Sequence, residues 1–260
     1  MKPTLPVILT ACILALSVTA CDDFFSSGWG SPREYSADNI NVTISNLDRW
    51  IDRTIGNPPL AKLVSENISR QVADLNHTHR AQFQRAGIRM AVESSGLGVA
   101  LFTNALTILS DMADTDDENM DAMLKGVFSG IQRDFRNSGG VGAARNITTI
   151  AAHDISGNPP EFSDVAFVNG STPSEVGQVI LVLTLAKLEE ENINDMTYWG
   201  FDLKAFDLEL SGGKVMIVGT PDPKAIVLAA YLNLILEEDN GRFADNFLTG
   251  AIRDAFRNNN

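Results

Sequence analysis

Three histidines and several acidic clusters are the side chains of this sequence that could do chemistry. His77-Thr78-His79 could present two imidazole nitrogens to a metal ion. On a helix, however, residues two apart point in different directions, and no cysteine or carboxylate cluster lies nearby in the sequence. A polar helix start therefore explains this pair better than a metal site. His153 precedes Asp154 next to a predicted loop, and a buried or loop histidine is the better interpretation there as well.

The acidic run from Asp114 to Asn119 has the beginning of a calcium-binding loop but not its end. The sixth position of such a loop requires glycine and the twelfth requires glutamate, whereas this chain has Asn119 and Lys125 at those places. A solvated acidic cap of a helix is the preferred interpretation, with loose binding of a divalent cation left open. The glycine-rich residues 138–142 lack the lysine of a phosphate-binding loop and predict a helix stop.

Motifs of catalytic centres are missing from the sequence. It contains no G-x-S-x-G elbow, no H-E-x-x-H pair and no C-x-x-C pair. We therefore expect no catalytic residues, no metal ligands and no cofactor. Whether two of the many carboxylates converge in the fold is a question that the sequence leaves open.

The first twenty residues have the pattern of an export signal. Lys2 gives a short positive start, and residues 5–18 form an apolar run of about fourteen residues. That length suits a secretory signal and falls short of the ~20 residues of a spanning helix. The run ends in Val18-Thr19-Ala20-Cys21.

This ending resembles the lipobox of bacterial lipoproteins, which has an aliphatic residue, a small residue, alanine or glycine, and then cysteine. The resemblance implies a thioether-linked diacylglycerol on Cys21, cleavage before it, and acylation, typically with palmitate, of the new amino terminus. Two or more acyl chains would hold the protein stably on a membrane. An ordinary signal peptide cut after Ala20 and an uncleaved anchor are the two alternatives.

The residues around Cys21 add to this hypothesis. Cys12 lies within the leader, so the mature chain would keep Cys21 as its one thiol and form no internal disulfide. Asp22 follows the cysteine, and among lipoproteins of bacteria with two membranes this favours the inner membrane, facing the periplasm, over the outer membrane. Ser-Gly-Trp-Gly at 27–30 and the stretch from Asn39 to Thr43 resemble uncharacterised helical lipoproteins of spirochaetes.

Composition narrows the functional classes. The formal net charge of -13 repels phosphate backbones, so we expect no nucleic-acid partner. The same net charge gains nothing from an anionic lipid surface, so charge alone would not hold the chain on a membrane. The hydrophobic content of 44% is that of a folded protein.

Composition and periodicity divide the chain into three parts. We expect a signal peptide at 1–20, a lipidated tether at 21–45 and a single α-helical domain with internal repeats at 46–260. Apolar residues at helical spacing, together with capping residues and Gly/Pro breaks, set the boundaries. Helices are expected at 45–55, 58–75, 79–94, 97–112, 116–136, 143–152, 172–191, 221–238 and 242–257. Residues 203–218 fit either a short β-hairpin or a helix that ends at Gly212.

The body repeats itself. Thr172-Pro173 begins an apolar run that ends in three glutamates, and Thr220-Pro221 begins a similar run forty-eight residues later. A second correspondence pairs residues 99–137 with 225–258. Between Ala225 and Leu236 the one polar residue is Asn233, so this helix should be buried on nearly all sides. The sequence thus predicts an all-α, multi-helix bundle built from repeated helical hairpins, with central apolar helices wrapped by amphipathic ones.

Three functions remain as hypotheses. The first is a non-catalytic module that is tethered by lipid on Cys21 and binds a protein partner through its helical surfaces. The second is a carrier of a hydrophobic small molecule, suggested by the many apolar helices. The third is an enzyme that uses carboxylates or His153, which would require these groups to converge in one cleft.

Overall fold

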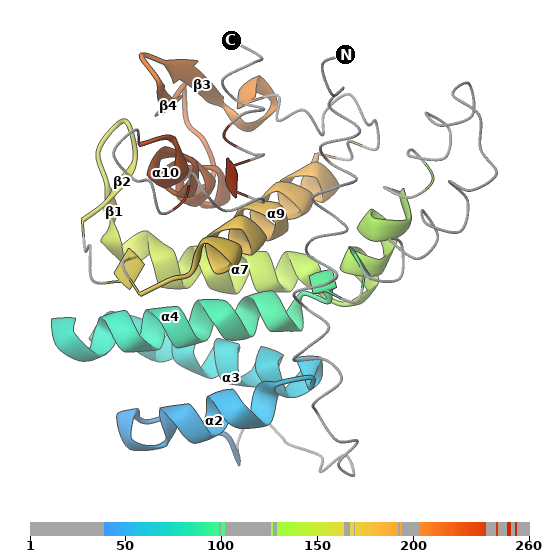
Figure 1. Ribbon diagram of the computed structural model, residues 1–260, viewed down its shortest axis with the longest axis vertical. Coiled ribbons are helices and arrows are strands. Elements are labelled where there is room, and N and C mark those ends of the chain that lie inside the picture. The colour runs from blue at the N-terminus through green and yellow to red at the C-terminus, as the bar shows by residue number, and fades with distance from the viewer. Residues whose placement is uncertain are drawn as a thin grey trace.

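The computed structural model of the protein describes residues 39–98, 100–101, 126, 129–163, 167–168, 170–191, 193, 203–237, 243, 249–250 and 253 (Figure 1). Over these residues the fold is mostly helical, with two small antiparallel strand pairs. Cys21, the acidic run at 114–119 and most of the helix expected at 242–257 lie outside the described residues.

The first three helices form where the sequence predicts them. A 3-10 turn, η2 (Ile44–Asn46), leads into α2 (Leu47–Thr54). After Pro58 and Pro59 comes α3 (Pro58–Gln71), followed by η3 (Val72–Asp74), and then α4 (His77–Ser94). Asparagines cap the two longer helices: the Asn57 side chain accepts from the N–H of Leu60, and the Asn76 side chain accepts from the N–H of His79.

The chain enters the packed body earlier than the expected start of the helical domain at residue 46. Ile40 and Val42 are buried, and Asn67 of α3 holds the segment between them. The Asn67 side chain accepts from the N–H of Val42 at 3.2 Å and donates to the carbonyl of Ile40 at 2.9 Å. Residues 40–45, within the range assigned to the tether, thus belong to the body.

The middle of the chain forms a further helix pair. Residues 129–137 are helical, and α7 (Gly140–Ala151) starts directly after Gly139, three residues earlier than expected. The 3-10 turn η4 (Ala152–Asp154) extends it. Gly140 is required here because a Cβ at this position would overlap the buried ring of Phe135.

Two apolar helices occupy the core. Helix α9 (Pro173–Glu190) buries eleven of its eighteen residues, and α10 (Pro223–Leu236) buries ten of its fourteen. Thr172 and Glu175 cap α9 reciprocally. The corresponding residues at the second copy of the run do not start α10, because Asp222 caps it instead. The central apolar helices are thus found, with different capping at their starts.

Two hairpins complete the described fold. Strands β1 (Ile155–Ser156) and β2 (Glu161–Phe162) flank the Gly157–Pro160 break, where the sequence predicted only an irregular stretch. After a 3-10 turn, η6 (Leu203–Phe206), strands β3 (Leu208–Ser211) and β4 (Lys214–Ile217) pair in antiparallel register, with Leu210 opposite Val215. This settles the two alternatives for residues 203–218 in favour of the hairpin. Gly212 and Gly213 both have positive φ, as a tight two-residue turn requires.

The helices stack as successive layers (Figure 1). Helices α2 and α3 lie at one end of the long axis, α4 packs on α3, and α7 packs on α4. Helices α9 and α10 lie beyond α7, with both hairpins beside α10. The buried apolar residues form one continuous cluster from Ile40 to Phe243. The prediction of a mostly helical fold is therefore right; it included the β3–β4 hairpin as an alternative and lacked the β1–β2 pair.

Candidate functional site

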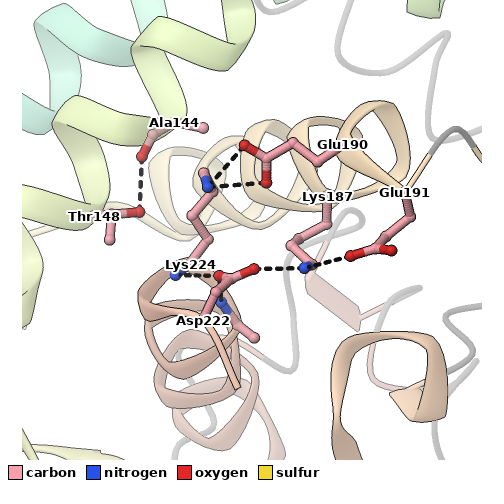
Figure 2. Close-up of polar contacts among 8 residues, drawn as sticks. Ala144, Thr148, Lys187, Glu190, Glu191, Asp222 and Lys224 are labelled. Carbon is pink, nitrogen blue, oxygen red and sulfur yellow. Dashed lines mark hydrogen bonds and ion pairs between the residues drawn. The ribbon is translucent and has the colours of Figure 1, made fainter. Parts of the chain in front are cut away.

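The densest group of charged side chains in the described part of the chain lies where the end of α9 meets the start of α10 (Figure 2). We call this group the α9–α10 ionic junction; it comprises Lys187, Glu190, Glu191, Asp222 and Lys224. It forms because the charged C-terminal end of α9 meets the charged N-terminal start of α10, outside the apolar stretches that both helices bury.

Lys187 is the centre of the junction. Its side chain is only 8% exposed, and its Nζ lies 2.5 Å from Oδ2 of Asp222 and 3.1 Å from Oε1 of Glu191. The ammonium also lies 6.0 Å from the centre of the Phe206 ring. Figure 2 shows Lys187 pointing between the two carboxylates. A cation in the last turn of a helix also complements the partial negative charge of the helix end.

Asp222 uses both carboxylate oxygens. Oδ1 accepts from the N–H of Lys224 at 2.7 Å and of Ala225 at 3.1 Å, which caps α10, while Oδ2 accepts from Lys187. The ammonium of Lys224 lies 2.9 Å from each carboxylate oxygen of Glu190. Glu189, which precedes Glu190 in α9, forms a further ion pair with Arg136, with 2.5 Å between its Oε2 and the Nε of Arg136.

The neighbours of Lys187 and Asp222 hold both side chains in their charged forms. Burial disfavours the charged form of Lys187, but its hydrogen bonds to Asp222 and Glu191 outweigh that effect and raise its pKa. Burial likewise opposes ionisation of Asp222, but the hydrogen bonds from Lys187 and from the N–H of Ala225 lower its pKa. Both groups are therefore charged at neutral pH. A charged, engaged ammonium has no free electron pair, so Lys187 is not poised as a nucleophile.

His153 and Asp154, the predicted pair beside a loop, differ in their surroundings. Asp154 is buried, and its carboxylate accepts a hydrogen bond from the side-chain amide of Gln84 on α4. The same amide donates to the carbonyl of Ile150 at 3.2 Å, which ties α4 to the end of α7. His153 is exposed. The two neighbours therefore do not share one environment, as joint acid–base work would require.

His77 and His79 lie in the first turn of α4, and the cap by Asn76 confirms the polar helix start. Among the described residues, no group of three or more His, Cys, Asp or Glu side chains could hold a metal ion. The expected lipidation site, Cys21, lies outside the described part of the chain.

Two asparagines hold both hairpins in place. The Asn233 side chain accepts from the N–H of Val215 at 2.7 Å and donates to the carbonyls of Val215 and Pro160, each at 3.0 Å. The Asn158 side chain pairs in the same way with Ile217, at 2.8 and 3.2 Å. These contacts use the β4 backbone groups that face away from β3.

Sequence reasoning missed the roles of Lys187, Asp222 and Asn158. A usable signal existed for Lys187, because it is the single charged residue within the apolar run 176–188. The sequence marks Asn233 as the one polar residue between Ala225 and Leu236, but its partners come from residues 160 and 215, which only the fold brings together. Asp222 was obscured by Thr220-Pro221, which resembles the earlier helix start more closely.

Comparison of the chain with protein-family models, with curated proteins and with solved structures finds no match. Within the described residues, no helix combines the length and the apolar character needed to cross a membrane.

Proposed function

We propose that this protein is a bacterial lipoprotein, attached to a membrane by lipid on Cys21 and facing the periplasm. The observation that carries the proposal is the leader that ends in Val18-Thr19-Ala20-Cys21. Asp22 favours the inner membrane.

We further propose that the body acts as a non-catalytic module that binds a protein partner. The ionic junction supports the non-catalytic part of this proposal. Its charged groups pair with one another and thereby hold α9 to α10, which is a structural role. The apolar surfaces of α9 and α10, which suggested a hydrophobic ligand, pack against other elements of the same chain. Packing thus explains these surfaces without a ligand, and we rank the carrier second.

The repeated helical hairpin belongs to this proposal as its architecture. The forty-eight-residue offset places the first copy of the run within two residues of the bounds of α10 at both ends. The two helices begin with different capping residues, Thr172 for α9 and Asp222 for α10, so the two copies of the repeat differ at their starts.

Lipid attachment is tested by expressing the full chain in a bacterium that is fed labelled palmitate. The wild-type protein should incorporate label and partition into detergent, whereas Cys21→Ser should lose both properties and stay folded. Cys12→Ala is the matched control, because this cysteine would leave with the leader. A Cys21→Ser protein that remained membrane-bound, or a Cys12→Ala protein that lost its label, would contradict the proposal.

The interaction role is tested by cross-linking in intact cells, followed by affinity purification of the lipidated protein. We expect one protein to be recovered reproducibly with the wild type and to be lost when exposed charges of the body are reversed. Repeated recovery of no protein above the level of an unrelated lipoprotein would overturn the role. A small molecule that co-purified in stoichiometric amount would favour the carrier instead.

A further inference from the structure

Charge is distributed unevenly along the layered body. Residues 39–98, which form α2, α3 and α4, contain seven Lys or Arg residues and five Asp or Glu residues. The described residues in 155–163, 170–191 and 203–237, which form the hairpins, α9 and α10, contain four basic and nine acidic residues. Over the described residues, negative charge is therefore concentrated in the part that forms the hairpins, α9 and α10.

The exposed side chains show a charge difference between the two ends in the same direction. On the α2–α4 end five cations are exposed: Arg49, Arg53, Lys62, Arg70 and Arg89. Four acids are exposed on the same end: Asp48, Asp52, Asp74 and Glu93. On the α10–hairpin end the exposed acids are Glu161, Glu190, Glu191, Asp207, Glu209 and Glu237, and among its described residues the cations with exposed side chains are Lys204 and Lys214. The two ends lie at opposite sides of the stack of helices (Figure 1).

The chain also joins the body at the α2–α4 end. Asn67 of α3 holds Ile40 and Val42, and Asn46 holds the next residues by donating to the carbonyl of Asn41 at 3.0 Å. Residues 21–38 separate this point from Cys21, and eighteen residues reach at most about 60 Å even when fully extended. Attachment at Cys21 would therefore keep the α2–α4 end nearer to the lipid.

We propose that the α2–α4 end faces an anionic lipid surface and that the α10–hairpin end points away from it. The inference rests on the proposed attachment at Cys21. Electrostatic screening at physiological salt acts over about 8 Å, so only the end that approaches the bilayer interacts with its charge. The mixed, slightly basic end approaches without repulsion, whereas the acidic end is repelled. This orientation assigns the acidic end to the protein partner.

The orientation can be measured by energy transfer from a single label to a dye in the bilayer. Because Cys21 is acylated, a cysteine introduced at exposed Ser45 of η2 or exposed Ser211 of β3 is the only thiol for labelling. Lipidated protein is placed in vesicles of phosphatidylcholine with about 30% phosphatidylglycerol, or of phosphatidylcholine alone. In anionic vesicles we expect transfer from position 45 to exceed that from position 211 by roughly two-fold or more, and the ratio to fall in neutral vesicles or high salt.

Charge reversal separates electrostatics from tether geometry. The double variant Arg49→Glu with Lys62→Glu should lower the transfer ratio in anionic vesicles and leave it unchanged in neutral ones, with an unaltered melting temperature as the control for folding. Equal energy transfer from positions 45 and 211, or a transfer ratio that is the same in anionic and in neutral vesicles, overturns the orientation. Failure to pellet with vesicles overturns the lipid attachment instead. In that case a histidine tag in place of Cys21, held on a nickel-chelating lipid, still tests the orientation of the body.

Discussion

The side-chain amide of Asn233 forms three hydrogen bonds inside the core, two of them with the backbone N–H and carbonyl of Val215. It thereby takes the place of a neighbouring strand along the outer edge of β4, where unpaired backbone groups would otherwise be buried. The third bond, to the carbonyl of Pro160, links the same amide to the residue before β2. One buried side chain thus positions both hairpins on α10.

Replacing Asn233 should be costly for this reason. Asn233→Leu keeps the size of the side chain but leaves three buried backbone groups without partners, at about 1–3 kcal/mol each before relaxation. We expect the free energy of unfolding in urea to fall by about 2–4 kcal/mol. Asn158→Ala is the matched control, because its two hydrogen bonds to Ile217 are exposed and should be worth about 1 kcal/mol or less. Equal losses in the two variants would refute the proposed role of burial.

The two functions of Asp222 can be separated by two substitutions. Asp222→Asn keeps an N-cap acceptor but removes the charge that faces Lys187. A third of the Asp222 side chain is exposed, so solvent weakens the pair and we expect a loss of about 1 kcal/mol. Asp222→Ala also removes the cap of α10 and should cost about 1 kcal/mol more. If the two variants unfold at the same urea concentration, the cap contributes nothing.

The stability of the protein should depend on pH through the same pair. Because the pKa of Asp222 is lowered in the fold, its contribution is present above its unfolded pKa of about 3.9 and is lost as the pH falls through the folded value. The raised pKa of Lys187 acts oppositely: its contribution is complete below about pH 10.4 and disappears as the pH rises through the folded value. Denaturation curves across this range should show a shallower acid decline for Asp222→Asn, and identical declines would count against the pair.

Asn67 should control the attachment of the amino-terminal segment. In Asn67→Ala, the N–H of Val42 and the carbonyl of Ile40 lose their partner, and we expect stability to fall by about 1–2 kcal/mol. Hydrogen exchange at Val42 should accelerate more than exchange in α10, because the segment can detach without unfolding the core. Acceleration of equal size at both places would show that the segment and the core open together.

Two glycines at the start of α7 offer a matched test of packing. Gly140→Ala would place a methyl group against the buried ring of Phe135, and we expect a cost of about 1–3 kcal/mol. Gly142→Ala meets no atom within 4 Å, so the better helix propensity of alanine should stabilise the protein by up to about 1 kcal/mol. Opposite signs in thermal melts are expected. A gain for both variants would mean that Phe135 moves aside freely.

Local patterns predicted most helices because their signals lie within a few residues. Asn57 before Pro58, and Thr172 before Pro173, mark helix starts that the structure confirms. The first hairpin was missed since two-residue strands around Gly157 carry too little alternation to be recognised. The early start of the body was missed because Ile40 and Val42 stand among polar residues, and their burial depends on Asn67.

The sequence by itself determined the helical class, the apolar character of α9 and α10, and the pattern around Cys21 that leads to the lipoprotein proposal. These properties follow from residue types at short spacing, which act on the chain locally. Only the tertiary structure decided that Lys187 meets Asp222, that Asn233 binds Val215, and that charge differs between the two ends of the body. These relationships join residues distant in sequence, and the packing of apolar faces, rather than local preference, brings such residues together.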